Sequence, residues 1–242
     1  MSKLTLQSGL FLFLCFIVSA SAQAYTPAPI PDRNHTDLHR AAADCKIKRG
    51  LSALHALPSA VKNEEINRID REGYTPLAYA AQNGCMKIVK LLVESGAIVD
   101  MAEEYSRWTP LLRAAQNRRA EVVRYLLAHG AEVNIRAAIG QTPLTEAILG
   151  SPFGYGHEGG RDKTLQALLE SGADVNLPGR FGRTPLMAAV FRGDANLVRL
   201  LIGKGANLSA KDEEGKTALD YAEEREIRNV LNAAAPLKGR DE

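Results

Sequence analysis

Residues 73–84 read GYTPLAYAAQNG, and this stretch decides the fold because the same pattern returns at near-constant spacing along the chain. The threonine of the pattern recurs at intervals of 34, 33, 42 and 33 residues, by subtraction of positions. The recurring threonines are Thr75, Thr109, Thr142, Thr184 and Thr217. A period this close to constant indicates an array of structural repeats.

The residues of each repeat predict two short helices. Thr75 is suited to cap a helix start, and Pro76 behind it lacks the N–H that would be left without a partner there. Leu77 and the alanines after it form one apolar face of this first helix. Apolar pairs within 88–92 give a second helix its buried stripe, and Gly96 suits the left-handed turn that ends it. Each repeat is expected to run helix, turn, helix and an extended crossing to the next repeat.

Two signatures recur in phase. The first opens repeats at 73–77, 108–111, 140–144, 182–186 and 215–219, and the second closes them at 95–97, 129–134, 171–176 and 204–207. Together they resemble the ankyrin repeat over about residues 36–234. The resemblance implies an all-α ankyrin-repeat solenoid of about five to six helix-turn-helix repeats joined by β-hairpin-like loops. The expected repeats are about 36–69, 70–103, 104–136, 137–178, 179–211 and 212–234.

Residues 1–24 predict a secretory signal peptide. Lys3 precedes an apolar run over 10–18, and small residues follow up to Ala24, where signal peptidase is expected to cleave. The run is shorter than the roughly 20 apolar residues of a membrane anchor. The mature chain would start with a proline-rich lead segment, 25–35, and no later stretch predicts membrane insertion. We expect a periplasmic protein, with secretion beyond the outer membrane as the alternative.

One repeat contains an insertion. Thr142 and Gly172 are 30 residues apart, against 21 for the equivalent pairs in three other repeats, so nine extra residues separate the two helices. They fall within 150–163, GSPFGYGHEGGRDK, whose glycines and proline predict an irregular loop. Residues 235–242 are expected to form a frayed C-terminal tail.

Cys45 and Cys85 remain after signal removal, and in an oxidising compartment such a pair can form a disulfide. Aligned by repeat, they lie at similar heights in the turns of adjacent repeats. Helix layers stack about 10 Å apart, which exceeds the Cα separation that a disulfide tolerates unless the first repeat leans in. Both outcomes stay open, and a disulfide would staple the atypical first repeat to the array.

The sequence contains no recognised catalytic or phosphate-binding motif, and we expect no enzyme activity, no cofactor and no metal site. His35 and His39 stand four residues apart with Asp37 between them, but no third metal ligand is in view, which favours solvated polar residues. His157 and Glu158 in the insertion are flanked by glycine, which preorganises them poorly for acid–base work. The formal net charge of +2 indicates neither a nucleic-acid nor a membrane partner.

The ankyrin resemblance implies where a partner protein would bind. In that family the hairpin tips and the exposed side of the first helices contact partners. The corresponding positions here are Arg71, Tyr74, Gln82, Asn83, Tyr105, Arg107, Trp108, Gln116, Asn117, Ile139, Gln141, Arg180, Phe181, Arg183, Phe191 and Arg192. Phe153 and Tyr155 of the insertion are added because loops on a rigid scaffold often carry partner contacts. Arginine and aromatic residues dominate protein–protein hot spots, although Trp108 and Phe181 could instead pack against neighbouring hairpins.

Two departures from the family pattern bear on structure. The usual histidine after Thr-Pro-Leu is replaced by Ala78, Leu112, Thr145, Met187 and Asp220, so stability is expected to rest more on apolar stacking. The hairpin before Trp108 is one residue longer and has Arg107 where the others have glycine, so its tip is expected to differ in shape.

These observations predict an exported bacterial ankyrin-repeat protein that binds another protein in the periplasm without catalysis and is monomeric on its own. Exported proteins of this kind resemble accessories of periplasmic peroxide-detoxifying systems, which gives a first alternative. An immunity protein that masks a toxin delivered to the periplasm is a second, and an enzyme that uses the inserted loop is a third. A repeat fold does not by itself decide among them.

Overall fold

The computed structural model describes residues 36–60, 62–151 and 160–235. The predicted signal peptide, the lead segment, Phe153, Tyr155 and all but the first residue of the predicted C-terminal tail lie outside it. The chain divides into two units, Met1–Arg33 and Asn34–Glu242, and every described residue belongs to the second. Within the described ranges the regular structure is helical, with no β-strand. The elements are α2 (Asp37–Ala43), α3 (Ile47–Ala56), α4 (Lys62–Ile66), α5 (Pro76–Asn83), α6 (Met86–Glu94), α7 (Pro110–Gln116), α8 (Ala120–Ala128), α9 (Pro143–Leu149), α10 (Arg161–Glu170), η2 (Arg180–Gly182), α11 (Pro185–Phe191), α12 (Ala195–Gly203), η3 (Leu219–Tyr221) and α13 (Arg225–Ala234).

Four of the five recurring threonines start the first helix of their repeats, as the sequence predicts. The Thr75 hydroxyl accepts a hydrogen bond from the Ala78 amide at 3.1 Å, and Pro76 is the first residue of α5. Thr109, Thr142 and Thr184 cap α7, α9 and α11 in the same way. Because capping depends on residues three apart, each helix start is set locally.

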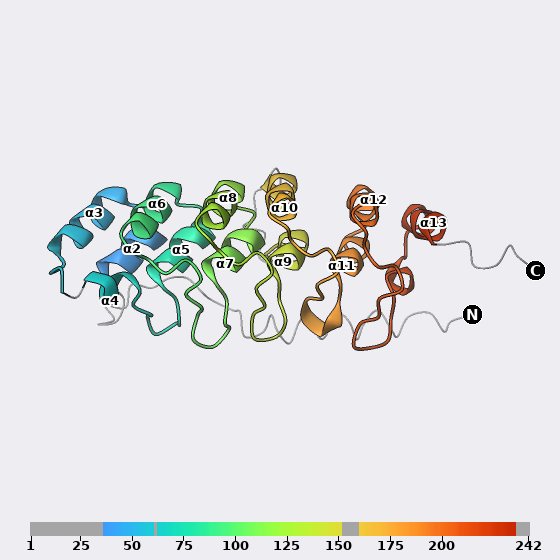
Figure 1. The fold of residues 1–242 in the computed structure, drawn as a ribbon, viewed down its shortest axis with the longest axis horizontal. Helices are drawn as coiled ribbons and strands as arrows, with labels where there is room; N and C mark the ends of the chain where they lie inside the picture. The colour runs from blue at the N-terminus through green and yellow to red at the C-terminus, as the bar shows by residue number, and fades with distance from the viewer. Residues whose placement is uncertain (1–35, 61, 152–159, 236–242) are drawn as a thin grey trace, which may run out of the picture. The chain divides into compact units, whose positions relative to one another are not determined.

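The helices stack in two rows (Figure 1). The first-helix row runs α2, α5, α7, α9, α11 and η3, and consecutive members pack on each other. The second-helix row contains α3, α6, α8, α10, α12 and α13, each beside the first helix of its own repeat. Leucines such as Leu77, Leu111 and Leu186 are fully buried between the rows, which stabilises by about 1.5–3 kcal/mol for each side chain. The prediction of an all-α repeat array is confirmed.

Asparagines in the loops after the second helices tie neighbouring repeats together. Asn134 accepts a hydrogen bond from the Asp174 amide at 2.8 Å and donates one to the Gly172 carbonyl at 3.2 Å. Asn176 bonds to Asn207 and Gly205 of the next repeat in the same manner. The asparagine side chains thus bond backbone N–H and C=O groups of the next repeat, which have no β-strand partner in this region.

The hairpin tips share one backbone closure. In four of them the first residue donates its amide to a carbonyl four residues later, as in Asp70 to Tyr74 at 2.9 Å. In the tip before Trp108 the bond runs from Glu103 to Trp108 at 2.8 Å, which confirms the extra residue. Arg107 adopts a left-handed φ of 58°, close to the conformation of Gly73 in the preceding tip. The tip is therefore longer, but the glycine position keeps its backbone shape despite the arginine.

Several boundaries differ from the sequence prediction. Helix α10 begins at Arg161, three residues inside the stretch predicted as irregular loop, because loop propensity fades once the glycines end. The last repeat has the single 3₁₀ turn η3 in place of its first α-helix, with Ala218 where α5, α7, α9 and α11 have their first-residue proline. In the first repeat Pro58 lies between α3 and α4.

Cys45 and Cys85 form a disulfide, with their Cα atoms 5.2 Å apart. Cys45 occupies the position of Gly84 in the next repeat and shares its left-handed backbone, with a φ of 56°. Asn83 donates a 3.1 Å hydrogen bond to the Ala43 carbonyl, which draws the two turns together. The layer spacing that argued against a bridge applies to helix axes, whereas these turns lie closer than the axes.

His39 is completely buried and belongs to the fold. Its Nδ1 accepts from the Thr36 amide at 3.3 Å, so Nε2 carries the proton and donates to the Tyr74 carbonyl at 3.1 Å. The interpretation of His39 as a solvated residue is therefore wrong. At the same position, Thr145 and Asp220 accept hydrogen bonds from the amides of Thr142 and Thr217, so two later repeats keep the local part of this polar tie.

Candidate functional site

Exposed apolar side chains occupy three successive hairpin tips. Tyr105, Ile139 and Phe181 are 74%, 57% and 55% exposed, and we call these three residues the tip ridge. Each has an exposed arginine close in sequence, namely Arg107, Arg136 and Arg180. Large apolar groups presented together to water are typical of protein-binding surfaces.

Phe181 is held out by its backbone. It lies in η2 with a left-handed φ of 58°, a conformation that is uncommon for a bulky residue. The guanidinium carbons of Arg180 and Arg183 lie 5.4 and 5.8 Å from its ring centroid. Its carbonyl accepts a 3.1 Å hydrogen bond from the Glu213 amide, so the tip is fastened to the next hairpin. The strained backbone and the flanking cations together present the ring to solvent.

An arginine stack lies beside the first-helix row. The Arg113 guanidinium carbon lies 4.6 Å from the ring centroids of both Tyr74 and Trp108. Tyr74 also stacks on Tyr79, with centroids 4.9 Å apart. Glu103 binds the same guanidinium through two hydrogen bonds of 2.6 and 2.7 Å. Burial lowers the pKa of Arg113, but the bonds to Glu103 outweigh it and hold the pKa above the ordinary value, so the cation is permanent.

Glu146 is a buried carboxylate on the same row. Gln116 donates a 3.1 Å hydrogen bond to its Oε2 from the neighbouring repeat. Burial raises the pKa of Glu146, while the Gln116 bond and the charges of Arg180 and Arg113 partly oppose the shift. The pair joins two repeats across the middle of the array.

Three of the predicted contact residues are buried. Trp108 is only 6% exposed and packs against Leu112 and Ala137, so its large ring serves the core of the hairpin. Asn117 uses its amide to donate to the Arg113 carbonyl at 2.9 Å. Gln141 is also buried. The prediction that these three side chains contact a partner is therefore corrected.

The remaining predicted contact residues divide by exposure. Those exposed are Arg71, Tyr105, Arg107, Ile139, Arg180, Phe181, Phe191 and Arg192, and those half-buried are Tyr74, Gln82, Asn83, Gln116 and Arg183. Half-buried Arg183 contacts the Asp212 and Glu214 carboxylates at 3.8 and 3.9 Å. The residues outside the described part of the chain are Phe153 and Tyr155.

Glu103, Arg113 and Glu146 were missed by sequence reasoning. Arg113 and Glu146 each follow the capping threonine by four residues, where α5 has Tyr79. In the other repeats this position holds Arg40, Tyr79, Ala188 and Tyr221, so a charged residue there was only a partial signal. Glu103 gave no such signal because its partner comes from the adjoining helix.

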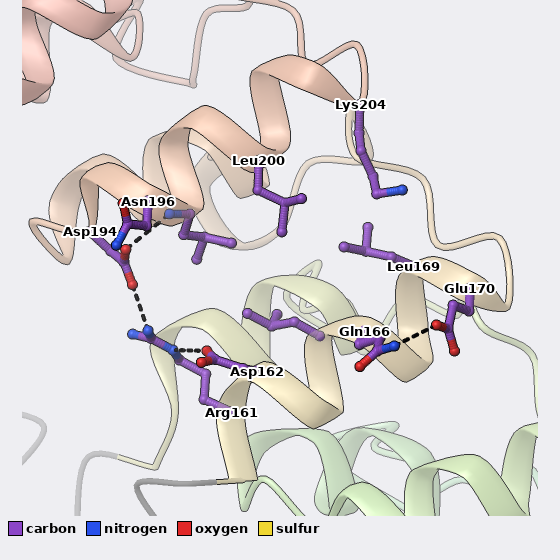
Figure 2. Close-up of a pocket in the computed structure, with 11 residues that line it drawn as sticks. Arg161, Asp162, Gln166, Leu169, Glu170, Asp194, Asn196, Leu200 and Lys204 are labelled. Carbon is purple, nitrogen blue, oxygen red and sulfur yellow. Dashed lines mark hydrogen bonds and ion pairs between the residues drawn. The ribbon is translucent and has the colours of Figure 1, made fainter.

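A second surface feature lies between α10 and α12. These helices border a groove of about 390 Å³ whose lining includes Leu165, Leu169, Leu197 and Leu200 (Figure 2). Arg161 spans one end by pairing with Asp194 at 2.6 Å.

The family model described as ankyrin repeats (3 copies) matches residues 38–137, 102–152 and 155–235. This chain belongs to the ankyrin-repeat family. Ankyrin repeats generally act as protein–protein interaction modules, so membership of this family supports the expectation that the chain binds another protein. Within the matched region, the tip ridge is carried by the hairpins that join consecutive repeats.

A similar curated protein is a transient receptor potential cation channel subfamily A member 1 homolog from Caenorhabditis elegans. It is 28% identical over 206 residues, which cover 75% of this chain and 17% of the relative. The ankyrin-repeat chain therefore spans about a sixth of the length of that relative.

In residues 36–60, 62–151 and 160–235, no helix has the length and apolar character needed to cross a membrane. Over the same residues, no three His, Cys, Asp or Glu side chains are grouped as metal ligands.

Proposed function

We propose that this ankyrin-repeat protein is a non-catalytic binding module that holds a partner protein along the tip ridge and the adjoining first-helix row. The tip ridge carries the proposal, because Tyr105, Ile139 and Phe181 expose apolar surface on consecutive repeats. Stacked helix layers are about 10 Å apart, so a partner that follows the ridge meets one apolar anchor per layer.

The charges beside the ridge suggest the chemistry of this partner. Arg107, Arg136 and Arg180 flank the three apolar tips, where the exposed Glu104 also lies beside Tyr105, and the exposed Glu213 and Glu214 belong to the next hairpin. An acidic protein surface with spaced apolar side chains complements this arrangement, since opposite potentials speed encounter and fix register.

We also propose that the protein acts in the bacterial periplasm. The predicted signal peptide over 1–24 supports export. The Cys45–Cys85 disulfide is in keeping with an oxidising compartment. Fractionation of native cells with N-terminal sequencing tests this: a periplasmic chain starting at Tyr25 is expected, and an intact chain starting at Met1 in the cytoplasm would contradict it.

The partner decides among the remaining alternatives. Affinity capture from periplasmic extract should be compared between the native protein, a Tyr105→Ser/Phe181→Ser double variant and a Leu51→Ser control. Leu51 is also exposed, but it lies on α3 in the first repeat. A partner lost only in the double variant is expected. A haem or peroxide enzyme would favour the accessory role, and a toxin would favour immunity.

A further inference from the structure

The second-helix row is interrupted at one place. Helices α3, α6, α8 and α10 form a series of packed neighbours, and α12 packs on α13, but α10 and α12 make little contact along their length. Leu200 of α12 is 44% exposed as a result. The groove between α10 and α12 fills this interruption, and Figure 2 shows Leu200 and Leu169 extending into it from the two helices.

A change in side-chain size accounts for the interruption. Five residues before the closing glycine, the second helices have Leu91, Tyr125 and Leu200, whereas α10 has Ala167. This position faces the preceding repeat, because Lys90 of α6 lies 5.9 Å from the centroid of the Tyr125 ring. The small Ala167 lets α10 close on α8, where it is buried, and α10 thereby withdraws from α12.

The floor of the groove is apolar, and each of its three carboxylates has a bonded neighbour, although Glu170 is bonded by a neutral amide and keeps its negative charge. Leu165 and Leu197 are buried beneath the more open Leu169 and Leu200. The carboxylates accept hydrogen bonds or ion pairs from neighbours: Asp162 and Asp194 from Arg161, and Glu170 from Gln166.

Lys204 is the exception among the charged groups of the groove. Within the described residues, no hydrogen bond or ion pair engages its ammonium. Figure 2 shows its side chain extending over the end of the groove near Leu169. The groove thus offers an aliphatic floor with one unengaged cation at its end, which complements a molecule with an apolar chain and an anionic head.

We propose that the groove between α10 and α12 binds a free medium-chain carboxylate, with its aliphatic chain on the four leucines and its carboxylate paired with Lys204. The volume of about 390 Å³ falls near the lower end of small-ligand sites, which favours a single short chain over a larger lipid. Binding here is independent of the tip ridge, since the lining residues all come from α10, α12 and their ends.

The test uses the mature chain and sodium dodecanoate below its micelle concentration, followed by calorimetric titration. Leu200→Asn removes part of the apolar floor and is expected to weaken binding about tenfold. Lys204→Glu should weaken dodecanoate about threefold and improve the binding of dodecylammonium. Leu51→Asn and Lys87→Glu, at exposed positions on α3 and α6, serve as matched controls.

Each outcome decides the proposal. Dodecanoate binding that falls in both groove variants and stays constant in both controls supports it, provided that all variants unfold at similar denaturant concentrations. No detectable binding overturns it. The proposal is also overturned if the Leu200→Asn variant binds dodecanoate as tightly as the native protein, or if the Leu51→Asn control loses as much affinity as Leu200→Asn. In either case the aliphatic chain of dodecanoate would lie elsewhere. Binding only to vesicles that contain anionic lipid would assign the chemistry to a membrane surface and contradict the free carboxylate.

Discussion

Glu103 and Arg113 form a two-point ion pair, with Nε to Oε1 at 2.6 Å and Nη2 to Oε2 at 2.7 Å. Glu103 is almost fully buried and comes from the lengthened hairpin, while Arg113 comes from the helix that follows it. The extra residue and the longer glutamate side chain set the hairpin apart from the one at Asp70, whose carboxylate accepts the Tyr74 amide at 2.9 Å. The pair fastens a hairpin carrying Tyr105 to the array.

Removing one partner of this pair should be costly. Glu103→Ala leaves the Arg113 cation between two aromatic rings without its carboxylate, and we expect a loss of about 3–5 kcal/mol in the free energy of unfolding. Urea denaturation measures it. The neighbouring exposed Glu104→Ala provides the control and should change stability by less than about 0.5 kcal/mol. Equal effects of the two variants would show that the buried pair has no structural role.

Reduction of the disulfide should loosen mainly the first repeat. Opening Cys45–Cys85 restores chain entropy to the unfolded segment, which typically costs about 2–4 kcal/mol. Because each repeat contacts only its neighbours, hydrogen exchange should rise in α2 and α3 and remain unchanged in α11 and α12. A Cys45→Ser/Cys85→Ser variant should show the same exchange with or without reductant. Uniform acceleration across the array would contradict this localised effect.

Two glycines should respond oppositely to alanine. A Cβ at Gly160 would collide with the backbone carbonyl of Arg118, so Gly160→Ala should destabilise by about 1–3 kcal/mol. A Cβ at Gly203, in the last turn of α12, meets nothing within 4 Å. Gly203→Ala should therefore stabilise by up to about 1 kcal/mol through helix propensity. Thermal unfolding compares them, and a harmless Gly160→Ala would show that the base of the insertion does not rest on Arg118.

Glu146 should make stability depend on pH. Burial raises its folded-state pKa above the unfolded value, so the folded protein holds this proton more tightly. Relative to a Glu146→Gln variant, native stability should fall as pH rises above the ordinary glutamate pKa of about 4.3, until Glu146 is fully ionised in the folded state. Urea midpoints at several pH values measure the difference. The exposed Glu121→Gln control should run parallel to the native protein, and a Glu146→Gln curve that did the same would refute the assignment.

The periodic parts of the structure could be predicted from the sequence because their causes are local. A threonine and a proline define each first-helix start, and the spacing of such starts gives the array. The extra residue before Trp108 was likewise visible as a count. The exposure of Tyr105 was expected as well, whereas for Phe181 packing against a neighbouring hairpin had stayed open. Both side chains are among the most exposed apolar groups of the described residues.

The remaining features depend on which residues the stacked repeats bring together. Trp108 looked like an exposed contact residue, but the following hairpin covers it with Ala137. The groove is attributed to the small size of Ala167 relative to Tyr125. The effect of this difference could not be predicted without knowing that α8 and α10 pack on each other. His39 was read without its acceptor, the Tyr74 carbonyl, which lies 35 residues further along the chain.

The most direct test of the proposed function is photocrosslinking in native cells, with a photoreactive residue placed separately at Tyr105, Phe181 and Leu51. Mass spectrometry then identifies the products. We predict one protein partner trapped from both Tyr105 and Phe181 and absent from Leu51. A partner that copurifies with the protein yet crosslinks only from Leu51, or equally from all three positions, would contradict binding along the tip ridge.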